Sequence, residues 1–202
     1  MRQTLLILTT LFLTASLAQA QSIGYGGRLG LNLATQSNLD DDDSALNPGL
    51  QVAGFANFSV LDILAIQPEL AFTQKGSRST DGDTDIRANL NYLQLNALGQ
   101  FRFGPGVKFL VNVGPYVGYA ATGNLVFSID DERESESIDD WEGSNRTDVG
   151  AILGAGAEIP LGFARLVVDA RFSLGFNSFV EDAEDPVANR VLSLGAGLMF
   201  GR

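Results

Sequence analysis

The stretch FARLVVDARFSLGFN, residues 163–177, decides the fold of this chain. From Leu166 to Phe176 its even positions are apolar or alanine, whereas Arg165, Asp169 and Arg171 occupy odd positions. A β-strand directs successive side chains to opposite faces. The stretch therefore predicts a strand with one apolar face and one ionic face. Strands of about 9–11 residues are long enough to cross a membrane when they are tilted.

The same alternation returns in seven further stretches, which are residues 22–34, 49–60, 64–75, 90–103, 107–121, 148–159 and 190–200. Within these strands we expect every charge to lie on the face that also holds the small and polar residues. Ten charged residues make up this predicted network: Arg28, Glu69, Lys75, Arg102, Lys108, Asp148, Glu158, Arg165, Asp169 and Arg171.

The connections between the stretches are short and long in strict alternation. The short ones are residues 61–63, 104–106 and 160–162, and the long ones are 35–47, 76–86, 128–145 and 178–189. The long connections hold 19 of the 24 acidic residues. Three short turns at one end and four long loops at the other are typical of an outer-membrane barrel. The fold class we predict is all-β: an eight-stranded antiparallel up-and-down transmembrane β-barrel.

The ionic face is expected to point into the barrel. It contains both signs of charge and many glycines, which suits a narrow interior that side chains fill at eight strands. Aromatic residues support an apolar face against lipid, because they gather near the two predicted interfaces. They are Tyr25, Phe58, Phe101, Phe103, Phe109, Phe163 and Phe200 toward the short turns, and Phe72, Tyr119 and Phe176 toward the loops. Pairing of the last strand with the first is expected, since an open edge is not tolerated in lipid.

Residues 1–20 are expected to be a signal peptide rather than part of the fold. Arg2 supplies a positive start, residues 5–13 an apolar run, and Ala18-Gln19-Ala20 a small-residue cleavage site. Residues 21–202 then form one outer-membrane β-barrel domain. Both termini of the mature chain are expected on the periplasmic side and the acidic loops outside the cell.

The composition excludes several classes of function. A formal net charge of −11 argues against nucleic acid as a partner, because phosphates need a basic surface. The chain has no histidine and no cysteine, which removes histidine bases, histidine metal ligands and cysteine nucleophiles. A serine or paired-carboxylate enzyme stays open in principle, but the adjacent pairs Asp130-Asp131 and Asp139-Asp140 lie in an acidic loop rather than apart on rigid elements. We predict no enzyme, no catalytic residue and no cofactor.

Two acidic runs are weak candidates for divalent cations, which take several oxygen ligands. They are Asp40, Asp41, Asp42 and Asp43 in the first loop, and Asp130 and Asp131 in the third. A solvated, self-repelling loop explains them better, because neither run has the glycine-spaced pattern of a calcium-binding loop. The third loop also keeps Ile129, Ile138 and Trp141, so it could extend its flanking strands into a protruding hairpin.

Five pieces of the chain carry a resemblance to a known family. They are GYGGRLGLNLAT (24–35), IQPELAFTQKGS (66–77), NYLQLNALGQFRF (91–103), VGPYVGYAATG (113–123) and NRVLSLGAGLMF (189–200). In this order they resemble the PorT-like outer-membrane β-barrels, small porin-family proteins of OmpA-like architecture. The resemblance implies the fold and the bacterial outer membrane, and some relatives assist a secretion system. The C-terminal pattern ending at Phe200 resembles the signal read by the barrel-assembly machinery, except that two residues follow the aromatic.

Three functional hypotheses follow. The first is an integral outer-membrane barrel with a structural, adhesive or secretion-accessory role and a plugged lumen. Its partners would be outer-membrane lipids, lipopolysaccharide and an extracellular or secretion-system protein. The second is a narrow channel for ions or small solutes. The third is a soluble periplasmic carrier of the lipocalin kind, which needs the apolar face inside.

Overall fold

The computed structural model describes residues 22–37, 44–81, 84–129, 132–138, 144–179 and 187–201. Within them, eight strands form the barrel: β1 (Ser22–Gln36), β3 (Asn47–Leu61), β4 (Leu64–Asp81), β5 (Thr84–Phe103), β6 (Lys108–Ile129), β8 (Thr147–Pro160), β9 (Arg165–Gly175) and β10 (Asn189–Gly201). Two shorter strands, β2 (Ser44–Ala45) and β7 (Glu132–Ser137), lie outside it. No helix in these ranges is long and apolar enough to span a membrane. The expected signal peptide, residues 1–20, lies outside the described residues.

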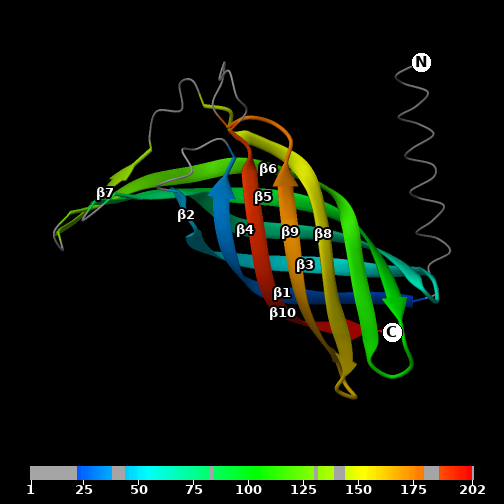
Figure 1. The fold of residues 1–202 in the computed structure, drawn as a ribbon. Coiled ribbons are helices and arrows are strands. Elements are labelled where there is room, and N and C mark those ends of the chain that lie inside the picture. The colour runs from blue at the N-terminus through cyan, green and yellow to red at the C-terminus, as the bar shows by residue number, and fades with distance from the viewer. Residues whose placement is uncertain are drawn as a thin grey trace, which may run out of the picture.

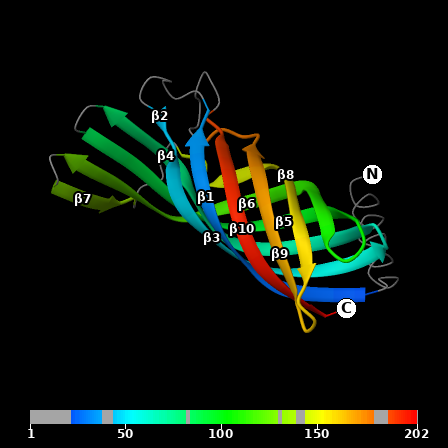
Figure 2. The same cartoon turned by 60° about the horizontal axis from the view of Figure 1, so that its bottom comes forward.

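All neighbouring strands are antiparallel and the sheet closes on itself (Figures 1 and 2). Its order is β4-β3-β1-β10-β9-β8-β6-β5, and a β4–β5 pairing joins the two ends. The first and last barrel strands pair from Gly24↔Gly201 to Gln36↔Asn189. Closure leaves no unpaired edge in the wall, which a lipid environment requires. The structure confirms the predicted eight-stranded up-and-down barrel.

Glycine allows two of the three tight turns at one end of the barrel. Gly104 and Gly106 link β5 to β6 with φ angles of 104° and 72°, and Gly162 links β8 to β9 with a φ of 88°. Residues with a side chain rarely adopt φ angles in this left-handed region, whereas glycine does so readily. These positive φ angles reverse the chain within a few residues, as the short connections predicted.

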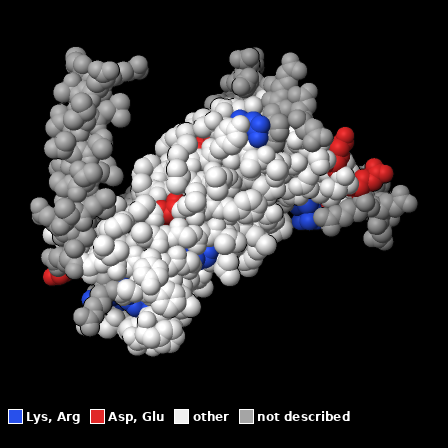
Figure 3. All heavy atoms as spheres, turned by 180° about the vertical axis from the view of Figure 1, so that it is seen from behind, with Lys and Arg blue, Asp and Glu red and all other residues white. Residues whose placement is uncertain are grey.

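The apolar face of every barrel strand points outward. Leu29 and Phe109 are both 66 % exposed, and Leu153 is 61 % exposed. Figure 3 shows one side of this wall as a largely uncharged surface. The lipocalin-like hypothesis is therefore wrong, because it required these side chains inside. The aromatic residues of both predicted girdles lie on this outer face; Tyr25 and Phe200 also pack together, with ring centroids 6.1 Å apart.

One charge departs from the predicted faces. Arg190 shares the outward face of β10 with Leu192 and is exposed. The expectation that every strand charge points inward is wrong at this position. Arg190 lies at the loop end of β10, where Leu174 of β9 is its partner in register. At the end of a membrane-spanning strand, a long cationic side chain can reach the polar interface.

Strands continue into two of the predicted loops. Residues 76–86 were expected to be a long irregular connection, but β4 continues to Asp81 and β5 begins at Thr84. This prediction is wrong because polar residues can pair across a hairpin as well as solvate a loop. In the third connection β6 reaches Ile129 and pairs with β7, which confirms the hairpin extension there. Figure 1 shows these strands running well past the rest of the barrel rim.

Candidate functional site: the barrel interior

Four charged side chains form a continuous network in the middle of the barrel. Arg28 Nη2 lies 2.6 Å from Asp169 Oδ1, and Arg171 lies 2.9 Å from both Asp169 Oδ2 and Glu69 Oε2. No more than 4 % of any of these side chains is exposed. Each charge thus has an opposite partner, which offsets the cost of removing it from water.

Neutral polar side chains complete the bonding of this central network. Asn96 Nδ2 donates to Glu69 Oε1 at 2.8 Å, and Arg28 donates to the Gln51 side-chain oxygen. Arg28 also donates to Ser193 Oγ at 3.3 Å. Hydrogen bonds to the remaining donors and acceptors hold each charged group in one orientation. The network therefore ties β1, β3, β4, β5, β9 and β10 together across the lumen.

A second cluster lies toward the loop end. Lys75 Nζ donates to Asp148 Oδ2 at 2.8 Å, and the Tyr116 hydroxyl donates to Asp148 Oδ1 at 3.1 Å. Asn189 Nδ2 donates to Asp148 Oδ2 at 3.0 Å. The ammonium lies 4.3 Å from the centroid of the Tyr116 ring and 5.1 Å from that of Tyr92. The lysine is held by one carboxylate and two aromatic faces, the latter by cation–π attraction.

A third cluster lies toward the turn end and is more open. Arg102 donates to the side chains of Asn57, Ser59 and Gln100. Arg165 Nε lies 3.6 Å from Glu158 Oε1, and its Nη2 donates to the carbonyl of Gly201 at 2.9 Å.

The structure thus places all ten predicted network residues on the inner side of the wall, but it divides nine of them among three groups. Lys108 belongs to none of the ion pairs among the described residues, although Glu158 is its partner in register. Arg102 likewise has neutral partners rather than a carboxylate.

Apolar side chains also fill the interior, and of these residues sequence reasoning placed only Tyr116 on the inward face. They form three clusters: Phe55, Leu110, Val167 and Met199 toward the turn end; Leu98, Tyr116 and Ile152 in the middle; and Leu90, Tyr92 and Ala120 toward the loop end. Ile138 and Phe179, from the connections above the rim, pack against the loop-end cluster. The signal was present in the sequence, because these strand residues share the inward alternation of their charged neighbours.

Several buried polar atoms in the lumen have no hydrogen-bond partner among the residues that the structure describes. They are Asn32 Oδ1, Gln94 Oε1, Asn112 Nδ2 and Glu158 Oε2, together with Asn91 Oδ1 near the rim. Buried water is the usual partner of such groups. The interior is therefore a packed polar core that suits bound water between its ion pairs.

The candidate metal ligands belong to the first and third long connections. Asp40, Asp41, Asp42, Asp43, Asp130 and Asp131 lie outside the described residues. Among the residues that the structure does describe, no group of three or more acidic side chains is placed to hold a metal ion.

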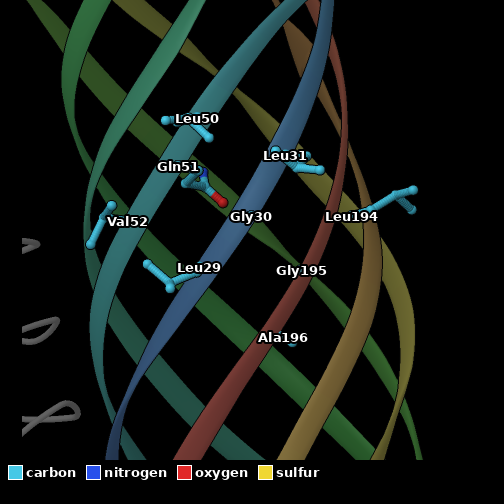
Figure 4. A pocket seen from close by; sticks show the side chains of 9 residues that line it. All are labelled: Leu29, Gly30, Leu31, Leu50, Gln51, Val52, Leu194, Gly195 and Ala196. Carbon is cyan, nitrogen blue, oxygen red and sulfur yellow. The ribbon is translucent and has the colours of Figure 1, made fainter.

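A hollow lies on the outside of the wall. This groove of about 530 Å³ follows the seam between β3, β1 and β10, and Figure 4 labels the residues that line it. Leu31, Leu50 and Leu194 border it, and Gly30, Gly195 and Ala196 leave the space between them. Its lining is apolar apart from Gln51, so it belongs to the apolar outer surface of the barrel.

An apolar outer wall, a closed sheet and an ionic interior define an integral β-barrel of the bacterial outer membrane. Residues 18–181 match the family model for the outer membrane protein beta-barrel domain. The chain belongs to this family, which confirms the predicted kind of barrel; its PorT-like character remains a prediction.

Solved structures agree in fold. A major outer membrane protein from Thermus thermophilus is 13% identical, with 89% of this chain and 99% of that chain covered and a TM-score of 0.51. Neisserial surface protein A is 13% identical, with 88% and 96% covered and a TM-score of 0.50. At such identity the likeness shows the fold alone. The comparison with curated proteins gives no match.

Proposed function

We propose that this protein is a non-conducting outer-membrane barrel whose function is carried out by its external connections. It acts as a structural, adhesive or secretion-accessory surface protein and catalyses no reaction. The acidic connections lie outside the cell, and both ends of the mature barrel lie in the periplasm. Short periplasmic turns and longer outer loops are the rule for such barrels, which supports this orientation.

The observation that carries the proposal is the filled lumen. The Arg28–Asp169–Arg171–Glu69 network crosses the barrel at its middle with side chains that are almost fully buried. An apolar cluster lies on each side of it, around Leu110 toward the turns and Leu90 toward the loops. A solute would have to displace paired charges and packed hydrocarbon together. Eight strands leave no spare width for a bypass.

The outer wall implies the immediate partners. Its apolar residues contact acyl chains, and insertion requires the barrel-assembly machinery. Lipopolysaccharide is the lipid expected around the loop end, where divalent cations would bridge its phosphates to the acidic connections. A protein partner outside the cell, or one belonging to a secretion system, completes this proposal.

Planar-bilayer recording of the refolded, purified protein tests the proposal. We expect no steady single-channel steps, with a channel-forming porin in the same bilayer as the positive control. Steady steps would overturn the closed-lumen assignment and favour the narrow-channel hypothesis. Neutralising Arg102, Lys108, Arg165 and Arg171 in turn would then identify the charges that line the path.

A further inference from the structure

We propose that the outward edge of β7 is a docking site for an extended, basic segment of another protein, which adds to it as a further β-strand. The inference deepens the proposed surface role and rests on it. In the part of the chain that the structure describes, β7 pairs with β6 alone, so one side of this strand has no partner. An exposed edge with unpaired backbone groups is a template for strand addition.

The register identifies which backbone groups are unpaired. The Ile138 N–H donates to the Gly123 carbonyl at 2.9 Å, and Glu136 is opposite Leu125. In an antiparallel pair, every second residue exchanges both hydrogen bonds with its partner. Glu134 and Glu136 therefore bond toward β6. The N–H and C=O groups of Ser135 and Ser137 point to the open side.

Side-chain exposure agrees that this edge is accessible. Glu134, Ser135, Glu136 and Ser137 are all exposed, which includes side chains on both faces of the strand. Figures 1 and 2 show β7 at the far end of the protruding sheet, away from the barrel axis. An incoming strand would therefore meet no part of the described wall.

The face that carries the glutamates has an apolar strip beside it. Glu134 is opposite Phe127 of β6, and Phe127 is opposite Ile86 of β5. Ile86 is 40 % exposed. Directly opposite side chains lie on the same face of a sheet. The site thus offers two carboxylates at the open edge, with the apolar side chains of Phe127 and Ile86 on the next two strands of the sheet.

The negative charges of Glu134 and Glu136 favour a basic strand as the occupant of this edge. A second copy of β7 would bring glutamate against glutamate in most registers, and like charges directly opposite are destabilising. A strand in which lysine or arginine occupies alternate positions would instead place a cation opposite Glu134 and another opposite Glu136. This complementarity favours a basic partner over self-association.

Binding of fluorescent octapeptides to the full barrel in detergent micelles tests the proposal. The test peptide alternates lysine with threonine and valine. The comparison peptide has glutamate in place of each lysine. We expect the lysine peptide to bind with a salt-dependent affinity and the glutamate peptide not to bind. The Glu134→Gln/Glu136→Gln variant should bind about fivefold more weakly, because two modest cross-strand charge pairs are lost. Equal binding of both peptides would overturn the proposal.

Proline distinguishes strand addition from simple charge attraction. Ser135→Pro removes an open-edge N–H without touching the β6 ladder, and it should weaken binding about tenfold or more. Ser135→Ala keeps the N–H and should bind like the unchanged protein. Unaltered binding by Ser135→Pro would contradict strand addition.

N-methylated peptides give an independent test with the unchanged protein. Methylating the alternate residues whose N–H groups face β7 should abolish binding, while methylating the other set should be tolerated. Tolerance of both sets, or loss with both, would overturn the proposal. None of these results would change the bilayer recording. Failure of strand addition at β7 can therefore be distinguished from failure of the closed-lumen proposal.

Discussion

At the scale of single residues, the central ion pairs share members, so that one charged side chain contacts two partners of opposite charge. Arg171 contacts both Glu69 and Asp169, whereas Asp169 contacts both Arg28 and Arg171. Breaking a buried pair by removing one member is costly because it leaves a charge without compensation. Replacing the whole pair by apolar groups removes that penalty.

Arg171→Met should therefore destabilise the barrel by about 3–5 kcal/mol. Arg171→Met/Glu69→Leu should be more stable than Arg171→Met alone, since it also removes the stranded carboxylate. The measurement is the folded fraction across a urea series in lipid vesicles, read from the compact band on cold SDS gels. The exposed Arg190→Met is the matched control and should change stability by no more than about 0.5 kcal/mol. A double variant worse than Arg171→Met would contradict the pairing.

At the scale of elements, the β4–β5 hairpin beyond the rim has its own charged clasp. Arg78 Nε and Nη2 donate to the two Asp85 oxygens at 2.9 Å and 2.7 Å, and Arg87 Nη2 donates at 2.6 Å. The hydrogen bonds from Arg78, followed by those from Arg87, hold the pKa of Asp85 well below its usual range. The same contact raises the pKa of Arg78.

The sign of this pKa shift gives a pH dependence. A carboxyl whose pKa is lowered on folding stabilises the hairpin above its unfolded pKa of about 3.9. We expect this stabilisation at neutral pH, with loss only as the pH falls from about 4 through the lower folded pKa. Carboxyl ¹³C shifts of Asp85 across an acid titration measure it. A midpoint at the ordinary pKa would contradict the clasp.

Asp85→Asn should loosen the hairpin at neutral pH, because the asparagine carries no charge to hold two guanidinium groups. Hydrogen exchange of the amides of residues 78–81 and 84–86 should become several-fold faster. Glu134→Gln, which lies on the neighbouring hairpin and outside the clasp, should leave this exchange unchanged.

At the scale of the whole molecule, the direction of the two faces determines where the protein can reside. Leu95 is 57 % exposed and Val168 37 % exposed on the outer wall, although both are apolar. An apolar wall that surrounds the barrel is stable in lipid and costly in water. The outer-membrane β-barrel family to which the chain belongs and its closed barrel fold both agree with a lipid environment.

Cysteine labelling tests the membrane position directly, since the chain has no native cysteine. In native membranes Leu95→Cys and Val168→Cys should resist a charged maleimide, because acyl chains cover them. Ser137→Cys, on the exposed hairpin, should react fully with the same reagent and is the control. Rapid labelling of Leu95→Cys without detergent would contradict the membrane-spanning assignment.

The alternation around Asp169 and Arg171, repeated in seven further stretches, was sufficient to predict the strands and their two faces, because side-chain direction in a strand depends on position alone. The closed barrel followed from the alternating short and long connections and from the need to pair every strand edge in lipid. The short connections at residues 61–63, 104–106 and 160–162 also gave the positions of the three tight turns. Local pattern failed at residues 76–86, where hydrophilic composition resembled a loop but the strands continued to Asp81 and from Thr84. It also missed apolar side chains such as Tyr92 and Leu110, which share the ionic face.

The sequence by itself determined the two alternating faces of each strand and predicted that the ionic face points inward, since the alternation follows from a period of two along each strand. Only the tertiary structure decided which charges meet. Arg171 and Glu69 are 102 positions apart, and their contact depends on how eight strands tilt and close around one axis. The same closure placed apolar clusters on both sides of the central ion pairs and left one side of β7 unpaired beyond the rim, within the described part of the chain. No local pattern encodes these distances, because they arise when the first and last strands join.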